Sequence, residues 1–521
     1  MDARMTVVGI VNPPFQYECP RAIRMTRYLW GAVCVVICLP IATSRAQDEK
    51  PVRKVSDQPA RRMDGYKGIW FTLGQFYGPG EEGKPYSDAS RQPVFPYGDK
   101  YSGGLGTYTA KHTPLAIYCP AVDKTFFVYG GTTDAKERHL LCMISYYDHQ
   151  RNRVPRPVVV HDKMGVDDPH DNPSLAIDGD GYLWVFVSGR ARSRPGFKYR
   201  STRPYSIDQF ELVSKEEMTY PQPQVIAGQG FVNLFTKYTG IRELYWESSR
   251  DGLKWSKDEK LAGIREPGDE RGGHYQTTAR HQNRIGTFFN RHPNGNVDQR
   301  TDLYYLQTDN QGTSWSNVSG RQLQVPLLDV GNSARVFDYR SRGLNVYLKD
   351  MGFDREGRPA LLYLTSRGHE PGPPNGPRHF CLARWDGNRW LSSKICETDH
   401  NYDMGSLYLS EDEWVAWLPS TPGPQAGHGG GELVIWRSRN RGESWTRSRQ
   451  VTQGSLRNQN YARRPINACD PFFVFWADGD PTRFGESHLY FSTSSGESVW
   501  RLPYQMDTEY AEPELVPFQR Q

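Results

Sequence analysis

The sequence predicts an all-β protein, a single seven-bladed β-propeller of four-stranded blades over residues 65–510. Three observations support this fold class: a composition rich in aromatic and turn-forming residues, a turn motif that recurs along the chain, and seven candidate hairpins. Aromatic residues make up 13% of the 521 residues, and 50 Gly and 37 Pro supply many turns, while long leucine-rich helical stretches are missing.

The N-terminal residues 1–46 are typical of a leader followed by a secretory signal peptide. Arg24 and Arg27 precede an apolar run over 29–41, and a small-x-small cleavage pattern ends at Ala46. The run is shorter than the roughly 20 apolar residues that a membrane span needs. We therefore expect cleavage after Ala46, no stable membrane span afterwards, and a secreted or periplasmic protein. A retained anchor is the alternative.

Charge and cysteine content exclude several classes of function. Lys and Arg number 64 against 59 Asp and Glu, a net charge of +5 with no long basic block, so nucleic acid is not an expected partner. The mature chain keeps five widely spaced cysteines, for which we expect free thiols or a single bridge rather than a disulfide framework or a zinc site. No cofactor motif is evident, and a structural metal ion stays open.

A turn motif supports the propeller. "TDNQGTSWS" (308–316) and "SRNRGESWT" (438–446) share the pattern S/T-x-N-x-G-x-x-W, and weaker copies occur at 248–256, 385–392 and 493–500. The tryptophans recur every 55 to 75 residues, which suits one blade with its loops. Ser or Thr and Asn or Asp bond the turn backbone and Gly supplies a positive φ, so we expect these turns to be structural.

The blades themselves are predicted from pairs of apolar segments joined by polar turns. Seven such hairpins are found, at 113–131, 172–189, 222–238, 275–292, 358–369, 404–420 and 463–479. The fifth is incomplete, and its partner strand is expected either upstream in 344–354 or downstream in 379–390. The segment 71–99 reads as a long Gly- and Pro-rich insertion at the surface.

Polar residues recur where the first strand of each blade begins. In a propeller this strand lines the central channel, and its start shares a face with the loop after the second strand. The first-strand starts contribute His112, His170, Asp171, Asn172, Tyr220, Gln222, His274, Tyr275, His400, Asn401, Tyr402, Asp403, Asn460, Tyr461 and Arg464. The loops after the second strands add Arg190, Lys237, Tyr238, Arg291, His292, Arg367, His369 and Arg483.

This collection predicts a pocket for an acidic sugar. Buried unpaired cations are costly, so many of them on one axis favour an anionic ligand, and Tyr and Trp stack on sugar rings. Asp171 and Asp403 are the only obvious ring carboxylates, so an ordinary glycosidase pair does not stand out. His and Tyr suit β-elimination better: a cation neutralises the uronate carboxylate, and Tyr or His removes the C5 proton.

Several motifs resemble the BNR repeat-containing propeller proteins, a group that includes ulvan lyases and an α-L-rhamnosidase family. They are "GYKGIW" (65–70), "KYSGGLGTYTAKHTPLAIY" (100–118), "TFFVYGGT" (125–132), "DPHDNPSLAIDGDGYLWVFVSG" (168–189) and "GHYQ" (273–276). For the lyases the resemblance implies a seven-bladed propeller that cleaves uronate-containing polysaccharide with His, Tyr and Arg.

The resemblance also assigns roles to residues. His170 matches the lyase histidine, and Tyr275 with Arg291 resembles the pair of a tyrosine and a carboxylate-neutralising arginine. Arg190 stands where such lyases often carry a second histidine, which keeps a cation but alters proton transfer. The rhamnosidase comparison instead points to His112 on a different face of the propeller, whereas the strand-start argument places His112 in the common ring.

The leading hypothesis is an exported polysaccharide lyase that acts on an acidic polysaccharide or oligosaccharide, with Tyr275 as base and acid and His170 assisting. The alternatives are an α-L-rhamnosidase-type hydrolase acting next to glucuronate with catalytic His112, a non-catalytic glycan-binding propeller, and a sialidase, for which no early Arg-Ile-Pro strand is found. The substrate-binding candidates are Arg291, Arg190, Asn172, His274, Lys237 and Tyr461.

Overall fold

The computed structural model describes residues 60–71, 97 and 103–517, apart from 136, 138, 240 and 241. The predicted leader and signal peptide lie outside the described residues, as does the 71–99 insertion apart from Phe71 and Tyr97. The described residues belong to a unit that spans Val55–Gln521. Across the described ranges, no helix is both long and apolar enough to cross a membrane.

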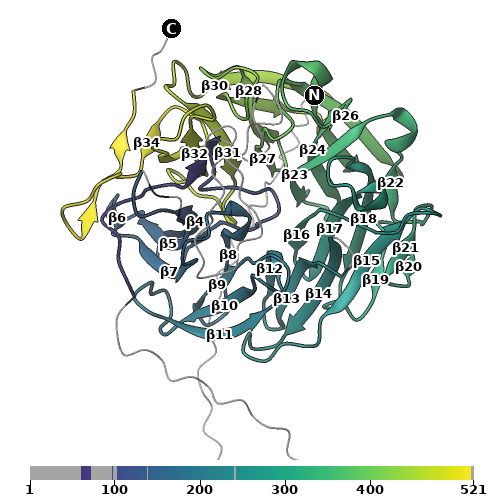
Figure 1. Ribbon diagram of the computed structural model, residues 1–521, viewed down its shortest axis with the longest axis horizontal. Coiled ribbons are helices and arrows are strands. Elements are labelled where there is room, and N and C mark those ends of the chain that lie inside the picture. The colour runs from purple at the N-terminus through teal and green to yellow at the C-terminus, as the bar shows by residue number, and fades with distance from the viewer. Residues whose placement is uncertain are drawn as a thin grey trace, which may run out of the picture. The chain divides into compact units, whose positions relative to one another are not determined.

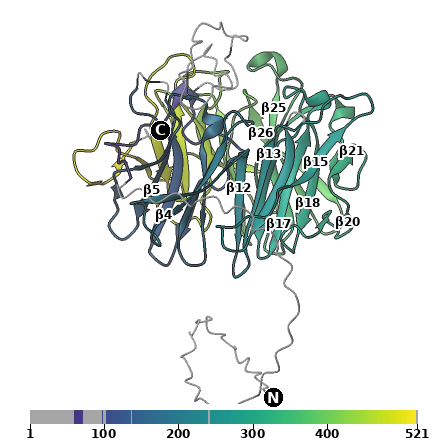
Figure 2. The same ribbon diagram turned by 60° about the horizontal axis from the view of Figure 1, so that its bottom comes forward.

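Seven sheets of mainly antiparallel strands form the predicted seven-bladed propeller, so the fold class is confirmed. Figure 1 shows them in a ring, with the first strands of the blades nearest the centre. Turned by 60°, Figure 2 shows the strands running from one face of the ring toward the other.

Blades 1 to 4 occupy the N-terminal part of the ring. Blade 1 has β3 (Ala116–Cys119), β4 (Lys124–Gly131), β5 (Leu141–Asp148) and β7 (Val158–Asp162); blade 2 has β8 (Pro173–Ile177), β9 (Leu183–Val187), β10 (Gly196–Ser201) and β11 (Phe210–Glu216). Blade 3 has β12 (Thr219–Ile226), β13 (Gly230–Lys237), β14 (Glu243–Ser249), β15 (Glu259–Arg265) and β21 (Leu327–Asp329); blade 4 has β16 (Gln276–His281), β17 (Arg284–Arg291), β18 (Thr301–Thr308), β19 (Trp315–Ser316), β20 (Gln322–Leu323) and β22 (Arg335–Phe337).

Blades 5 to 7 complete the ring. Blade 5 has β23 (Asn345–Phe353), β24 (Pro359–Ser366), β25 (Arg378–Trp385) and β26 (Trp390–Thr398); blade 6 has β27 (Ser406–Leu409), β28 (Trp414–Thr421), β29 (Glu432–Ser438) and β30 (Thr446–Gln450); blade 7 has β31 (Asn458–Arg463), β32 (Val474–Gly479), β33 (Leu489–Ser492), β34 (Val499–Arg501) and β36 (Glu514–Leu515). Four 3-10 turns are η1 (Pro169–Asp171), η2 (Pro293–Gly295), η3 (Arg340–Arg342) and η4 (Pro373–Asn375).

Two predicted hairpins change in detail. The fifth pairs β24 with the upstream strand β23, which was one of the two alternatives for its partner. The seventh begins earlier than predicted, because β31 ends at Arg463, where the predicted hairpin started. The segment after β31 instead runs beside blade 1, where Ile466 pairs with Ile117.

The recurring turns join the third and fourth strands of their blades, as expected for structural turns. Between β18 and β19 the Thr308 hydroxyl accepts from the Gly312 amide at 2.9 Å, and Asn310 Oδ1 accepts from the Ser314 amide at 3.0 Å. Ser438 and Asn440 repeat both bonds between β29 and β30, at 2.8 and 3.0 Å. The motif therefore builds the same turn twice from the same side chains.

The ring closes between blades 7 and 1 through apolar packing and a C-terminal strap. Phe127 of β4 stacks on Phe472 with ring centroids 5.2 Å apart, inside a shared buried cluster. After blade 7 the chain adds β35 (Tyr510–Ala511), which pairs with β6 (Val154–Pro155) beside blade 1. β36 then pairs with β34, so the strap binds to both sides of the junction.

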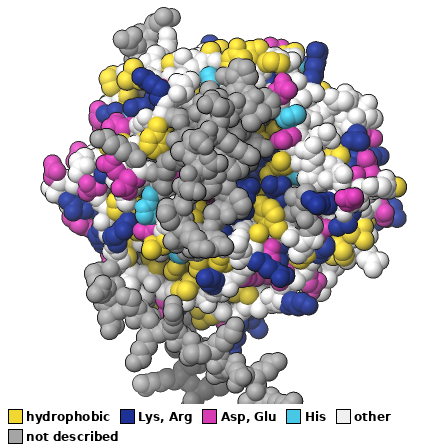
Figure 3. Space-filling view, viewed as in Figure 1, with side chains coloured by type: hydrophobic (Ala, Val, Ile, Leu, Met, Phe, Trp, Pro, Cys, Tyr) yellow, Lys and Arg dark blue, Asp and Glu magenta, His cyan; other side chains and the backbone are white. Residues whose placement is uncertain are grey.

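The five cysteines of the described chain, Cys119, Cys142, Cys381, Cys396 and Cys469, are free thiols, as expected without a disulfide framework. On the outer part of the face in Figure 3, Lys and Arg side chains are interspersed with Asp and Glu side chains. This mixed surface agrees with the balanced composition of the chain.

Candidate active site

His170 lies in η1, the short turn that leads into the first strand of blade 2. The Asp168 side chain accepts from the His170 amide at 3.0 Å, and its Oδ1 lies 2.5 Å from His170 Nδ1. On the other side of the ring, His170 Nε2 lies 3.1 Å from the Tyr108 hydroxyl oxygen. Asp168, His170 and Tyr108 thus form one chain of buried polar contacts.

The charges in this chain decide where the proton sits. Burial raises the pKa of Asp168, but His170, Arg194 and Arg190 lower it by more, so Asp168 is an ionised carboxylate. Burial lowers the pKa of His170 to about 3, so its imidazole is neutral near pH 7. A carboxylate can only accept, so the His170 proton is on Nδ1 and the Nε2 lone pair accepts from the Tyr108 hydroxyl.

A buried ion network holds η1 in place. Arg190 Nη1 lies 2.9 Å from Asp168 Oδ2 and 3.1 Å from His170 Nδ1. Arg194 pairs with both Asp168 and Asp171, and the Lys163 ammonium lies 2.9 Å from Asp171 Oδ2. Asp171 therefore serves its own turn, while Arg190 touches the proton-carrying pair.

Two predicted residues position the segment that carries Tyr108. Asn172 donates from Nδ2 to the carbonyl oxygens of Leu105 and Tyr108, at 2.9 and 2.7 Å. His112 Nδ1 accepts from the Thr109 amide at 3.2 Å, so its proton is on Nε2, which donates to the His170 carbonyl at 3.0 Å. Both nitrogens of His112 have backbone partners, and the ring lies in the common site.

Tyrosines link His170 to the next blades. The Tyr220 ring lies between those of His170 and Tyr275. Its centroid is 5.8 Å from the His170 centroid and 5.7 Å from the Tyr275 centroid. Tyr461 meets Tyr108 edge to face at 5.1 Å. Tyr220 and Tyr461 have φ of 55° and 54°, each where the register of its strand shifts. Left-handed backbone at a bulky residue is costly and concentrates at functional sites.

Tyr275 stands directly before β16 and is surrounded by cations. Lys111 Nζ and Arg300 Cζ each lie 4.6 Å from its ring centroid, and Arg242 Cζ lies 5.9 Å away. Arg300 also donates to the Tyr402 hydroxyl at 2.6 Å. We call Lys111, Arg242 and Arg300 the cation cluster.

Burial and neighbouring charges shift the pKa values of two members of the cation cluster. Burial lowers the pKa of Lys111 well below its ordinary value, and Arg300, Lys349 and Arg463 lower it further. For Arg242, burial lowers the pKa, but the phenol oxygens of nearby tyrosines, first among them Tyr275, raise it overall. No ion pair joins Lys111 or Arg242 to a carboxylate within the described ranges. Burial and the nearby cations thus favour the neutral amine of Lys111, and a bound anion would favour its charged ammonium form.

Three other predicted residues already have protein partners. Arg291 places Nε 2.9 Å from Asp302 Oδ2 and Nη2 2.6 Å from Glu266 Oε1, so two carboxylates neutralise it. His274 donates from Nδ1 to the Asn290 carbonyl at 2.9 Å and accepts from the Ile264 amide at 3.0 Å. Lys237 pairs with Asp258 at 2.9 Å. None of these contacts involves Tyr275 or His170.

Tyr108, Asp168 and the cation cluster were not among the site residues predicted from the sequence. Tyr108 and Lys111 stand in the quoted motif 100–118, but they precede the first blade, so the strand-start rule selected only His112. Arg242 and Arg300 end the loops after the second strands of blades 3 and 4, whereas only the first residues of those loops were considered. Both ends of such a loop lie on the same face, so the whole loop is the better sequence signal.

Residues 141–397 match the family described as BNR repeat-containing family member. This part of the chain belongs to the BNR repeat-containing family. The expected resemblance is thereby confirmed at the level of the family.

Curated relatives place the chain at a distance from ulvan lyases. It is 23% identical over 288 residues to the Ulvan Lyase-PL25 of Pseudoalteromonas sp. (strain PLSV), covering 48% of this chain and 57% of that protein. It is 23% identical over 362 residues to an ulvan lyase of Nonlabens ulvanivorans, covering 60% of this chain and 72% of that protein. The chain thus spans little more than half the length of the first of these relatives.

Solved structures share the fold. A PL25 ulvan lyase structure superposes with a TM-score of 0.62 at 17% identity, covering 75% of this chain and 94% of that chain. A second structure, described as bound to -[GlcA(1-4)Rha3S]-, gives a TM-score of 0.62 at 15% identity over 83% of this chain and 96% of that chain.

Proposed function

We propose that this member of the BNR repeat-containing family is an exported polysaccharide lyase that cleaves uronic-acid-containing chains by β-elimination. The observation that carries the proposal is the cation cluster around Tyr275, beside the Asp168–His170–Tyr108 chain. The distant similarity to ulvan lyases supports the same reaction class. Export rests on the predicted signal peptide.

The cation cluster would hold the uronate carboxylate. A neutralised carboxylate makes the adjacent C5 proton more acidic, and arginine can bind both oxygens of the group. The sequence analysis gave this role to Arg291 with Arg190. Since Asp302 and Glu266 already neutralise Arg291, the proposal gives it to Lys111, Arg242 and Arg300.

Tyr275 would perform the proton transfers. Positive neighbours favour the phenolate form of a tyrosine, which can remove the C5 proton. The C5–H electron pair then forms the C4–C5 double bond, the C4–O4 bond breaks, and the departing oxygen takes its electrons. Tyr275, now protonated, returns the proton to that oxygen, so the site ends in its starting state.

His170 would assist through Tyr108. Asp168 keeps the His170 proton on Nδ1, which leaves Nε2 to accept from the Tyr108 hydroxyl. The same logic of carboxylate, imidazole and hydroxyl operates in nucleophile triads, where the carboxylate fixes the tautomer. Tyr108 thus supplies a hydroxyl of fixed direction, and the Tyr220 ring lies between those of His170 and Tyr275.

The hydrolase alternative finds less support in the geometry. A catalytic His112 would need a free ring nitrogen, but both have backbone partners. Of the two ring carboxylates, Asp171 is taken up by Lys163 and Arg194, and Asp403 accepts from the Gly430 amide at 2.6 Å and from Thr398. Neither carboxylate stands ready for acid or base catalysis on a sugar.

The decisive experiment follows absorbance at about 235 nm, where an unsaturated uronate absorbs, while the purified mature protein digests a panel of uronic-acid polysaccharides. We expect a rise that Tyr275→Phe reduces by about 100-fold or more in kcat, since this is what a general base contributes. Tyr182→Phe, an outer tyrosine whose ring packs against Arg200, is the matched control.

Each other outcome selects another function. Release of rhamnose without an absorbance rise would replace the lyase by the hydrolase and move attention to His112. Binding without any product would favour a glycan-binding propeller. A rise that Tyr275→Phe leaves intact would keep the reaction class and overturn the role of Tyr275.

A further inference from the structure

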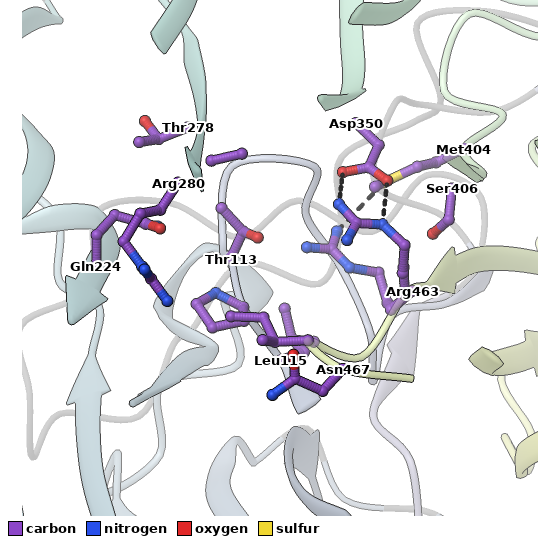
Figure 4. Close-up of a pocket in the computed structure, with 14 residues that line it drawn as sticks. Thr113, Leu115, Gln224, Thr278, Arg280, Asp350, Met404, Ser406, Arg463 and Asn467 are labelled. Carbon is purple, nitrogen blue, oxygen red and sulfur yellow. Dashed lines mark hydrogen bonds and ion pairs between the residues drawn. The ribbon is translucent and has the colours of Figure 1, made fainter. Parts of the chain in front are cut away.

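Apart from the candidate active site, the structure contains a cavity of about 240 Å³. Figure 4 shows Arg280 and Gln224 on one side, Asp350, Met404 and Arg463 on the other, and Thr113 between them. Its lining comes from the first strands of six blades, blade 1 and blades 3 to 7, or from the segments beside them.

The cavity and the candidate active site occupy opposite ends of one channel. Tyr275 precedes β16 and Arg280 stands near its end, five residues or about 16 Å farther along an extended strand. Arg463 separates the two ends, since its guanidinium donates to the carbonyl oxygens of Thr109, at 2.6 Å, and of His112. The same backbone segment carries Lys111 on the active-site side.

Positive charge predominates in the cavity. Its lining contains three arginines, Arg280, Arg463 and Arg464, and one carboxylate, Asp350. Arg464 Nε lies 3.3 Å from Asp350 Oδ2, so the carboxylate is matched by one arginine. Burial lowers the pKa of Arg463 to about 10, with Asp350 raising it and Arg464 lowering it. The lining thus retains an excess of positive charge.

Arg280 is the arginine best placed to receive a ligand. Its guanidinium donates to the Gln282 carbonyl at 2.8 Å, and no carboxylate pairs with it among the residues that the structure describes. Arg280 and Asn467 also line two adjoining cavities, of about 230 and 460 Å³. Both side chains therefore stand where three hollows meet at this end of the channel.

We propose that this cavity is a second ligand site, specific for a small oxyanion. Guanidinium groups bind carboxylate and sulfate through paired hydrogen bonds, and Asn467 and Gln224 add neutral donors around them. A volume of about 240 Å³ has room for a small ion or one acidic sugar ring. The site does not depend on the proposed lyase activity, because Arg280 lies about 16 Å along the strand from Tyr275.

Isothermal titration of the mature protein at constant ionic strength tests the site, with chloride as the background anion. Sodium sulfate and sodium glucuronate are titrated separately, and glucose serves as the neutral probe. We expect saturable binding of at least one anion and none of glucose. Binding of glucuronate but not sulfate would identify a sugar acid as the ligand, and the reverse an inorganic ion.

Two variants attribute the binding to this cavity. Arg280→Gln removes the unpaired charge, and Asn467→Asp adds a negative charge where φ is 54°, a conformation that Asp tolerates. We expect each substitution to lower the affinity for the anion by about 10-fold or more. Arg284 lies on the same hairpin but pairs with Asp309 at 2.9 Å, so Arg284→Gln should leave the affinity for the anion unchanged.

Titrations in a Tyr275→Phe background separate this site from the active site. Anion binding that persists there and is lost in Arg280→Gln supports the proposal, whether or not the protein is a lyase. Absence of anion binding, or binding that neither cavity variant weakens, would overturn it.

Discussion

At the residue scale, the candidate site combines two groups that can carry protons, His170 and Tyr275, with the cation cluster. His170 has a fixed tautomer because Asp168 accepts from Nδ1, and Tyr108 is oriented by the free lone pair of Nε2. Tyr275 has cations on several sides. Each arrangement depends on a buried contact between residues of different loops, so single substitutions can separate their contributions.

Replacing Asp168 by Asn should impair proton transfer more than substrate binding. An amide can donate to His170 Nδ1, which would move the imidazole proton to Nε2 and leave Tyr108 without an acceptor. We expect kcat to fall by about 100-fold or more with a smaller change in KM. Steady-state kinetics across pH measure this, and a loss confined to KM would contradict it.

Replacing Arg242 by Gln should affect substrates according to their charge. Loss of a cation that faces the uronate carboxylate is expected to lower kcat/KM by about 10-fold to 100-fold, the range of a charge-assisted hydrogen bond. Arg250→Gln, at an exposed position of blade 3, is the matched control. The comparison is made by the elimination assay; an effect as large in the control would exclude a specific role.

At the scale of elements, the repeated turns show how local chemistry fixes a blade. Gly312 and Gly442 have φ of 88° and 82°, and hydroxyl and amide side chains bond the backbone on either side of them. The tryptophan of the motif supports the same turn: Trp315 is buried and meets Trp246 of the neighbouring blade at 5.9 Å. These contacts are local in sequence or reach the adjacent sheet.

Two glycines in blade 4 separate backbone strain from steric overlap. A Cβ at Gly312 would lie 2.3 Å from the Trp246 ring, whereas at Gly320, with φ of 82°, no atom lies within 4 Å. We expect Gly320→Ala to cost about 1 kcal/mol through φ alone, and Gly312→Ala to cost clearly more. Urea unfolding measures both, and equal losses would show that the tryptophan moves aside freely.

At the scale of the whole molecule, many buried groups have pKa values that differ from their ordinary values. Burial lowers the pKa of His112 to about 3, of His170 to about 3 and of His274 to about 4. His292 and His400 are also buried, with pKa values well below the ordinary value. Burial acts in the opposite direction on two acids, raising the pKa of Glu247 to about 7 and that of Asp403 well above its usual range.

The stability of the propeller should therefore fall as the pH drops below about 6.5. In that range the unfolded histidines bind protons that the folded ones do not, so acid favours unfolding. Because the histidines with a lowered pKa outnumber the acids with a raised pKa, we expect a net uptake of protons on unfolding at pH 5.5. Calorimetry in buffers of different ionisation enthalpy measures the uptake, and a release of protons would contradict the prediction.

The sequence by itself determined the propeller, its blade number and its turns, because apolar alternation, Gly positions and turn side chains act over a few residues. It also predicted that His170 and Tyr275 share one face, because each stands at the start of a first strand, whereas the face of His112 was left open between two interpretations. The partners of the cations were decided by the tertiary structure. Arg291 looked like the carboxylate-binding residue but is neutralised by Asp302 and Glu266, whereas Arg242 and Arg300 reach Tyr275 from the far ends of their loops.

The same reason explains Tyr108, whose contact with His170 joins residues that are 62 positions apart. Charge pairing and hydrogen bonding between loops depend on how neighbouring blades pack. No local sequence pattern predicts this packing. The sequence thus specifies the scaffold and the face that bears the site, while the packing of the blades decides which side chains meet there.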